Sequence, residues 1–304
     1  MKAVVFGGTG FIGSHVVEQL CLAGHQVTTV VRNTSDLTFL ESLGVEIVKI
    51  DFSNQKNIGK VMEGNEVVYN CTANANLYTE NMERLVEINL TQKLIEAAAL
   101  HGIIRFIQLS SIVIYDFSSD EAIDESYIPK AESVIQKVMF ERENIIQTIG
   151  KKTGIETVIL RPASTIGVRD KKSFFSRLFT AYLNNQFPLV GKGDTKVSLI
   201  DTRDIGRAME WLGKYQIPKG DNGIYLLKGF DTTWYKLKKE IDRVTGKNVK
   251  TVQLPMSEET ITVKNFTVNR IWNDRKIKSL GFHTKYTLTD AVESSVRDIL
   301  SRDR

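Results

Sequence analysis

The stretch Gly7-Gly8-Thr9-Gly10-Phe11-Ile12-Gly13 decides the fold of this chain, and it directly follows a short apolar run that ends at Phe6. An amphipathic pattern with helical spacing comes next. One glycine permits a tight turn, another lets main-chain N–H groups approach an anion, and a third lets the helix pack closely on the strand. The pattern predicts a cradle for a dinucleotide's diphosphate, made by Gly7, Thr9, Gly10, Phe11, Ile12 and Gly13.

The alternation of short β-branched runs and longer helical stretches continues to about residue 165. It predicts parallel βαβ units, with helices on both faces of one sheet. The predicted strands lie at 3–6, 26–31, 45–50, 66–71, 103–109 and 156–160, and the helices near 12–23, 54–62, 82–100 and 131–150. The fold class is therefore α/β, a Rossmann-type doubly wound parallel sheet with a smaller C-terminal part.

That C-terminal part is predicted to be an α+β lid over residues 167–304 that binds the substrate. The NAD(P)-binding Rossmann domain is expected to take residues 1–166 and also to use 195–215. The lid's helices are expected near 174–183, 233–244 and 288–301, and its strands near 223–228 and 249–254. Only five prolines occur in the chain, which argues against a flexible linker.

The composition is that of an ordinary globular protein, with 42% apolar residues, 25% charged residues and a net charge of +4. No apolar run reaches the roughly 18 residues of a membrane helix, so we expect no membrane partner. In the start MKAVVFGGTG, the apolar run that ends at Phe6 is too short for the core of a secretory signal, and we expect a cytoplasmic protein. Two cysteines and four histidines predict neither a disulfide framework nor a metal site. Charges that alternate in sign instead of clustering predict no nucleic-acid partner. The expected partner is a small-molecule substrate, bound in a pocket that the lid forms.

The residue that follows the second strand bears on the choice of coenzyme. NAD-selective sites place a carboxylate there to accept from the ribose 2′-OH, whereas this chain has Arg32. A guanidinium pairs with a 2′-phosphate, so NADP(H) is favoured over NAD(H). In the alternative interpretation Arg32 is solvated and Asp36 serves the ribose.

Two further strand ends supply candidates for the cofactor site. Asp51 could accept the adenine amino group and Phe52 could flank the ring, although Asp51 is equally suited to capping a turn. Thr72 and Ala73 end the fourth strand, where small residues leave room for the cofactor's ribose.

The glycine stretch, Asp51, Thr72-Ala73 and the run from Ser110-Ser111 to Tyr115 resemble the extended short-chain dehydrogenase/reductase superfamily, in particular its NAD-dependent epimerase/dehydratase-like members. The likeness extends through Arg161-Pro162-Ala163 to Val197–Asp204. It implies an oxidoreductase with a nicotinamide cofactor, which Pro162 and Ala163 help to bind.

The resemblance also implies a catalytic serine, tyrosine and lysine, the last two spaced as YxxxK. In that scheme the phenol exchanges a proton with the substrate oxygen, the lysine stabilises the phenolate and holds the ribose, and the serine orients the carbonyl. Ser111 and Lys137 fit two of the positions. Ser133 stands where the tyrosine is expected.

Three hypotheses accommodate this departure. In the first, Tyr127 or Tyr115 supplies the proton from a loop. In the second, water or the substrate supplies it, and Lys137 and Ser133 only position the reactants. In the third, the site binds NADPH without turnover, like family members that resemble redox-responsive regulators.

The substrate class and the oligomeric state follow less directly. Nucleotide-sugar chemistry is less favoured, because such members carry an arginine where this chain has Lys196. An apolar or aromatic carbonyl compound suits an aromatic stripe that could equally be core, formed by Phe174, Phe175, Phe179, Tyr182 and Phe187. A homodimer could form through the helices at 82–100 and 131–150, whose apolar faces are equally explained by packing on the sheet.

Overall fold

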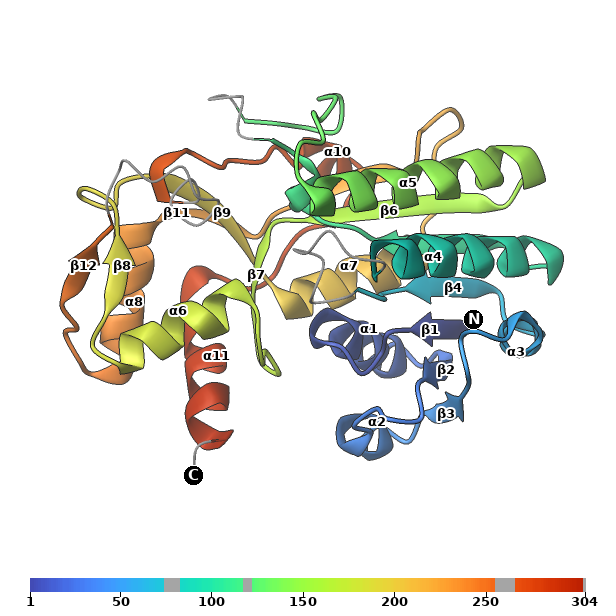
Figure 1. Cartoon of the computed structure of the whole chain (residues 1–304), viewed down its shortest axis with the longest axis horizontal. Helices are drawn as coiled ribbons and strands as arrows, with labels where there is room; N and C mark the ends of the chain where they lie inside the picture. Colours follow the sequence, from blue (N-terminus) through green and yellow to red (C-terminus); the bar gives the residue numbers. More distant parts are fainter. Residues whose placement is uncertain (74–82, 117–121, 255–265, 303–304) are drawn as a thin grey trace. The chain divides into compact units, whose positions relative to one another are not determined.

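Seven strands form the large sheet, in the order β10-β6-β5-β4-β1-β2-β3 (Figure 1). The computed structural model describes residues 1–73, 83–116, 122–254 and 266–302. The strands are β1 (Lys2–Phe6), β2 (Gln26–Val31), β3 (Glu46–Lys49), β4 (Val67–Asn70), β5 (Arg105–Leu109), β6 (Glu156–Pro162) and β10 (Ile224–Leu227). Neighbouring strands from β3 to β6 are parallel, which confirms the Rossmann-type α/β fold.

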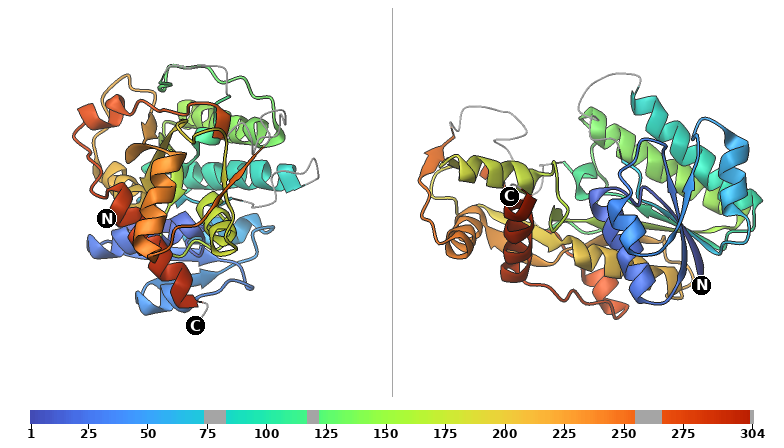
Figure 2. Two further views of the ribbon diagram at one scale, coloured as in Figure 1. Left: turned by 90° about the vertical axis from the view of Figure 1, so that its left-hand side faces the viewer. Right: turned by 90° about the horizontal axis from the view of Figure 1, so that it is seen from below.

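Helices cover both faces of this sheet. They are α1 (Phe11–Leu22), α2 (Thr38–Ser42), α3 (Gln55–Met62), α4 (Glu83–Leu100), α5 (Val134–Thr153) and α7 (Thr202–Lys214), and the short helix η1 (Ile112–Ile114) follows β5. The right-hand view of Figure 2 shows α4 and α5 on one face and α1 and α7 on the other. Apolar side chains of α3, α4 and α5 form one core with the sheet. Because both faces are covered, β1 and β4 are apolar along nearly their whole length.

The remaining elements form two smaller sheets and their helices. The strands are β7 (Ser164–Ile166), β8 (Phe187–Leu189), β9 (Lys196–Asp201), β11 (Phe230–Thr233) and β12 (Thr251–Gln253), and the helices are α6 (Phe174–Leu183), α8 (Trp234–Thr245), α10 (Arg275–Ser279) and α11 (Leu288–Arg302). β9 pairs in parallel with β7 and antiparallel with β11. β8 pairs in parallel with β12.

The chain divides into two compact units, each made of three separate segments. Unit 1 comprises residues 1–116, 128–161 and 205–225, and unit 2 comprises 117–127, 162–204 and 226–304. The strand expected near 223–228 as part of the lid instead joins the large sheet as β10, beside β6. The sequence pattern of that strand carries no information about which sheet it joins.

The aromatic stripe expected in the lid belongs mainly to the core of unit 2. Phe175, Phe179, Tyr182 and Phe187 are completely buried, and Phe174 packs against the same cluster. The rings of Phe175 and Phe179 stack with centroids 6.3 Å apart. These side chains therefore fill the interior of unit 2, and the core interpretation of the stripe is confirmed.

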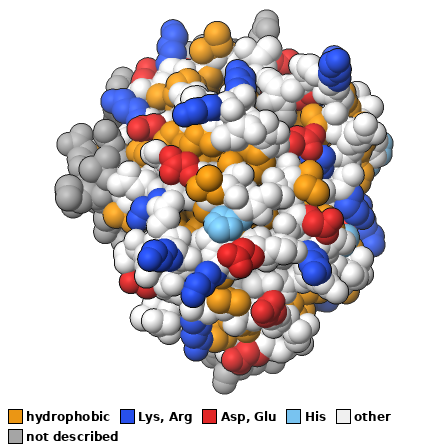
Figure 3. Space-filling model, turned by 90° about the vertical axis from the view of Figure 1, so that its right-hand side faces the viewer, with side chains coloured by type: hydrophobic (Ala, Val, Ile, Leu, Met, Phe, Trp, Pro, Cys, Tyr) orange, Lys and Arg blue, Asp and Glu red, His pale blue; other side chains and the backbone are white. Residues whose placement is uncertain are grey.

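The surface carries charges of both signs. On the face drawn in Figure 3, lysine and arginine side chains alternate with acidic ones and leave no single-sign patch in that view. Among the described helices, none is both long and apolar enough to cross a membrane.

Two glycines of unit 1, each on a different helix, allow a test of helix packing. A Cβ on Gly206 of α7 would lie 2.5 Å from the carbonyl oxygen of His15 on α1, so Gly206→Ala must push the two backbones apart. We expect a loss of about 1–3 kcal/mol in the free energy of unfolding, although alanine favours helix. The measurement is urea denaturation. Gly59→Ala on α3 is the control, because the three atoms nearest to its Cβ would all belong to the ring of His101, which can move. An equal loss in both variants would contradict the packing argument.

Candidate functional site

The glycine turn between β1 and α1 is the centre of the candidate site in unit 1. Gly7 has a φ of +83°, and its carbonyl oxygen accepts from the N–H of Gly10 at 3.0 Å. Gly10 is the N-cap of α1, and no side chain among the described residues caps it. The first turn of α1 also contains no acidic residue within this described helix. Its N–H groups are therefore suited to an anion.

The turn has room only for main chain. A Cβ on Gly7 would lie 2.6 Å from the carbonyl oxygen of Cys71, and a Cβ on Gly13 would lie 2.1 Å from the carbonyl oxygen of Gly7. Thr9 and Gly10 are exposed, and Phe11 and Ile12 are half-buried. Main-chain donors, an exposed tip and the helix dipole together fit the diphosphate of a dinucleotide. A nicotinamide dinucleotide bound here would supply the hydride for a redox reaction.

Arg32 follows β2 with its side chain exposed, and its carbonyl oxygen accepts from the N–H of Ser35 at 3.1 Å. Asp36, the alternative ribose partner, accepts at one oxygen from the N–H of Thr38 at 3.2 Å and from the Thr38 hydroxyl at 2.9 Å. The carboxylate of Asp36 is thus engaged in the turn before α2.

Asp51 and Phe52 follow β3. Asp51 accepts from the N–H of Ser53 at 2.9 Å and from its hydroxyl at 2.7 Å, so it caps the turn, and these bonds hold the pKa of the exposed carboxyl below its usual range. Phe52 packs edge-on against Phe6 with ring centroids 6.1 Å apart. The side chain of Phe52 is therefore partly committed to the core of unit 1.

Thr72 and Ala73 follow β4 and differ in their surroundings. Thr72 is half-buried, and both its N–H and its hydroxyl donate to Oδ1 of Asn70, at 3.2 and 2.7 Å. Ala73 is exposed. Pro162 ends β6 as a buried residue, and the N–H of buried Ala163 donates to the carbonyl oxygen of Leu227 at 2.8 Å.

Two adjacent serines after β5 have different partners. The Ser110 hydroxyl is buried and donates to Oε1 of Glu143 at 2.5 Å. Ser111 is half-buried, and its hydroxyl oxygen accepts from the N–H of Val113 at 3.1 Å as the cap of η1. Within the described part of unit 1, the hydroxyl hydrogen of Ser111 has no acceptor, so this serine can donate to a substrate oxygen.

Ser133 and Lys137 lie at the start of α5. Ser133 is the N-cap, and it forms a reciprocal capping box with Gln136. Its hydroxyl therefore has a structural role in starting the helix. Lys137 lies on the exposed stripe of α5 with Glu141 and Asn144. Its ammonium makes no hydrogen bond or ion pair with any residue that the structure describes.

The two tyrosines proposed as replacement proton donors have different environments. Tyr115 is completely buried in unit 1, where its hydroxyl accepts from Nη1 of Arg161 at 2.7 Å. Tyr127 is half-buried in unit 2, and its N–H donates to the carbonyl oxygen of Asp124 at 3.3 Å. Tyr115 is thus committed to the interior, and of the two only Tyr127 has an accessible side chain.

A buried ion pair near these residues was not anticipated from the sequence. Nε and Nη2 of Arg161 donate to the two carboxylate oxygens of Glu143 at 3.1 and 2.5 Å, and the pair also bonds Tyr115 and Ser110. Burial alone would lower the pKa of Arg161, but the hydrogen bonds and charge of Glu143 outweigh it and hold that pKa above its ordinary value. The pair fixes α5 to β6 beneath the end of β5.

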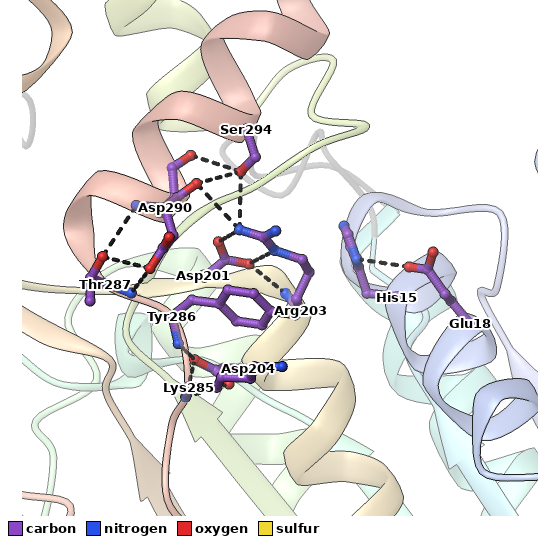
Figure 4. A network of polar contacts seen from close by, with 11 residues as sticks. His15, Glu18, Asp201, Arg203, Asp204, Lys285, Tyr286, Thr287, Asp290 and Ser294 are labelled. Carbon is purple, nitrogen blue, oxygen red and sulfur yellow. Dashed lines mark hydrogen bonds and ion pairs between the residues drawn. The ribbon is translucent and has the colours of Figure 1, made fainter. Parts of the chain in front are cut away.

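A second polar network, in unit 2, follows β9 (Figure 4). Arg203 binds Asp201 through both Nε and Nη2, at 2.9 and 2.6 Å, and its guanidinium lies 3.8 Å above the ring of Tyr286. Asp204 accepts from the N–H groups of Lys285 and Tyr286 at 2.9 and 3.0 Å. These contacts fix the segment before α11 to the corner between β9 and α7.

A surface hollow and the potential metal ligands are two further features of the described residues that bear on a site. An open hollow of about 600 Å³ lies in unit 1 around the amino ends of the strands, with Lys2, Gln26 and Glu46 in its lining. The glycine turn lies at the other end of β1, so the hollow belongs to a different region. Across residues 1–73, 83–116, 122–254 and 266–302, no group of His, Cys, Asp and Glu has a metal-binding arrangement.

The chain belongs to the NAD dependent epimerase/dehydratase family, whose model matches residues 3–225. A relative from Synechocystis named "Putative dihydroflavonol 4-reductase" is 28% identical over 83% of this chain and 76% of its own length. A sterol-4-alpha-carboxylate 3-dehydrogenase (decarboxylating) of Dictyostelium discoideum is 21% identical over 98% of this chain and 92% of its own length. The photosystem II assembly factor Ycf39 of Trieres chinensis is 26% identical over 84% and 73%.

Solved structures share the fold. A UDP-glucose 4-epimerase of Thermotoga maritima with UDP-glucose superposes with a TM-score of 0.84 at 21% identity, covering 100% of both chains. A UDP-glucuronic acid 4-epimerase of Bacillus cereus in complex with UDP-glucuronic acid and NAD gives a TM-score of 0.83 at 21% identity, covering 99% of this chain and 100% of the other. At this identity the likeness establishes the fold alone.

The ion pair of Glu143 with Arg161 yields a stability prediction. Glu143→Ala leaves the Arg161 charge buried without its partner, so the free energy of unfolding should fall by about 3–5 kcal/mol. Glu141→Ala, on the exposed stripe of the same helix, should change it by less than about 0.5 kcal/mol. Both values come from chemical denaturation followed by circular dichroism. A loss in Glu143→Ala no larger than that in Glu141→Ala would show that the pair contributes nothing.

Proposed function

We propose that this protein is an NADP(H)-dependent oxidoreductase that acts on a small carbonyl or hydroxyl compound. The observation that carries the proposal is the glycine turn, in which bare main chain and an uncapped helix N-terminus meet at the end of β1. Membership of the family and its reductase and dehydrogenase relatives support the redox reaction. Unit 2 is proposed to bind the substrate.

The preference for the phosphorylated coenzyme rests on Arg32. Its guanidinium is exposed directly after β2, where a dinucleotide in a Rossmann fold places its adenosine ribose. Asp36, the carboxylate that could instead accept from a 2′-OH, already accepts two bonds from Thr38. A 2′-phosphate would therefore find the Arg32 cation, while one oxygen of the nearby Asp36 carboxylate is engaged with Thr38.

Removal of the Arg32 side chain tests this preference. A charge-assisted contact contributes about 1.5–3 kcal/mol, so Arg32→Ala should weaken NADPH binding about tenfold or more and leave NADH binding unchanged. Isothermal titration calorimetry with both coenzymes measures this. Lys60→Ala, which removes an exposed cation from α3, is the control and should alter neither affinity. Equal losses for the two coenzymes in Arg32→Ala would refute the assignment.

For the reaction itself, this chain offers a hydroxyl donor and two candidates for proton handling. Ser111 is proposed to donate its hydroxyl hydrogen to a substrate oxygen, and the bond from the N–H of Val113 to its oxygen supports this role. Lys137 is proposed to stabilise a developing anion. Tyr127 is proposed as the proton donor, because Ser133 caps α5 and the Tyr115 hydroxyl is bound to Arg161.

The proton donor is tested by turnover. Proteins are mixed with NADPH and a panel of aldehydes, ketones and quinones while the absorbance of the reduced nicotinamide is followed. Tyr127→Phe and Lys137→Ala should each lower kcat about a hundredfold or more. The Tyr127→Phe variant should bind NADPH as the unaltered protein does. Tyr235→Phe, an exposed tyrosine of α8, is the control. Full activity in Tyr127→Phe would exclude this tyrosine as the donor.

A second candidate function is an NADPH-binding sensor without turnover. Two observations favour it. Ser133, at the position of the expected tyrosine, caps α5, and Lys137 lies on the exposed stripe of that helix. The same assay separates the two functions. Tight NADPH binding without turnover of any compound would support the sensor.

A further inference from the structure

Arg142 is a buried arginine of α5 that reaches the end of β4. Its Nε donates to Oγ1 of Thr91 at 2.8 Å, and its Nη1 binds Oε2 of Glu87 at 3.3 Å. Its Nη2 donates to the carbonyl oxygen of Thr72 at 2.9 Å. Burial lowers the pKa of this guanidinium, and the negative charges of Glu87 and Glu143 oppose that effect. Such a buried cation is costly unless it is paired and hydrogen-bonded, and here each of its three nitrogens has a partner.

Arg142 holds the main chain of Thr72 at its carbonyl oxygen, and the peptide just before that carbonyl, Cys71–Thr72, is a wall of the glycine turn. A Cβ on Gly7 would lie 2.6 Å from the carbonyl oxygen of Cys71 and 2.8 Å from the nitrogen of Thr72. The N–H of Cys71 also donates to the carbonyl oxygen of Phe6 at 2.8 Å. The Cys71–Thr72 peptide therefore contacts the backbone of the turn directly, and a shift of this peptide changes the shape of the turn.

The end of β4 is held from two sides. On the sheet side, Oδ1 of Asn70 accepts from the N–H and hydroxyl of Thr72, and its Nδ2 donates to Gln108 at 2.8 Å. On the helix side, Arg142 reaches the Thr72 carbonyl oxygen. The planar guanidinium reaches the three acceptors through three separate nitrogens, whereas a lysine ammonium carries all its donors on one nitrogen.

We infer that Arg142 is a positioning residue for the dinucleotide site, because its guanidinium holds the carbonyl oxygen of Thr72 and thereby keeps the adjoining Cys71–Thr72 peptide against Gly7, which sets the shape of the diphosphate cradle. The inference rests on the proposed dinucleotide binding. Arg142 acts through the main chain at the diphosphate, which NADPH and NADH share. Its loss therefore weakens both coenzymes alike, whereas the loss of Arg32 affects only one.

The experiment measures the Kd of the full-length protein for NADPH and for NADH by calorimetry, together with Tm. Arg142→Gln should weaken both coenzymes by about tenfold or more, and Arg142→Lys by less. Arg105→Gln is the matched control. Arg105 is also buried and donates to a glutamate, Glu156, and to a carbonyl oxygen, that of Leu212, but it begins β5 at the far end of the sheet. Arg105→Gln should lower Tm by a similar amount and should change the Kd for either coenzyme less than about twofold.

A milder variant keeps the test valid if Arg142→Gln does not fold. Thr91→Val removes only the acceptor of Nε and should weaken both coenzymes by the same small factor. The inference is overturned if the Arg142 and Thr91 variants bind as the unaltered protein does, if they lose no more affinity than Arg105→Gln, or if only one coenzyme is affected. If the unaltered protein binds neither coenzyme, the proposed function fails and this inference fails with it.

Discussion

The approach of main chain to main chain at the end of β1 is the constraint on which the rest of unit 1 depends. A side chain on Gly13 would collide with the carbonyl oxygen of Gly7, and a side chain on Gly7 would collide with the backbone of Cys71 and Thr72. This closeness aims the first turn of α1 past the end of the sheet, where its N–H groups remain without side-chain acceptors among the described residues. The residues after β4 contact the backbone of this turn, and Arg142 binds one of them. The position of the turn therefore depends on β4 and on Arg142.

Local patterns predicted most of the fold, because burial of a strand or a helix face is written in contiguous residues. The strand Gln26–Val31 and the helix Phe174–Leu183 occur at the predicted bounds. The partner of β10 could not be predicted in this way. A short apolar run has the same appearance whether it closes a small sheet or extends a large one, and only tertiary packing decides between them.

The candidate site divides along the same line. The glycine turn is contiguous and was predictable, whereas the bond from Arg142 to Thr72 joins residues 70 positions apart. Ser133 shows a competition between two patterns. It occupies the position that the family resemblance gives to a tyrosine, yet a serine followed three residues later by Gln136 is also a capping box, and the structure contains that box. Two patterns also compete at Lys137. It occupies the position that the resemblance gives to the catalytic lysine, yet it shares the exposed stripe of α5 with Glu141 and Asn144.

The division of the chain into six alternating segments has a consequence for its biogenesis. The large sheet needs β10, which is synthesised long after β6, so a growing chain exposes the open hydrogen-bonding edge of β6 while the intervening residues are made. Unpaired edges invite association with other chains. A nascent chain released early therefore lacks both α7 and its last sheet strand, and neither unit can be obtained as a fragment by cutting the gene at one place.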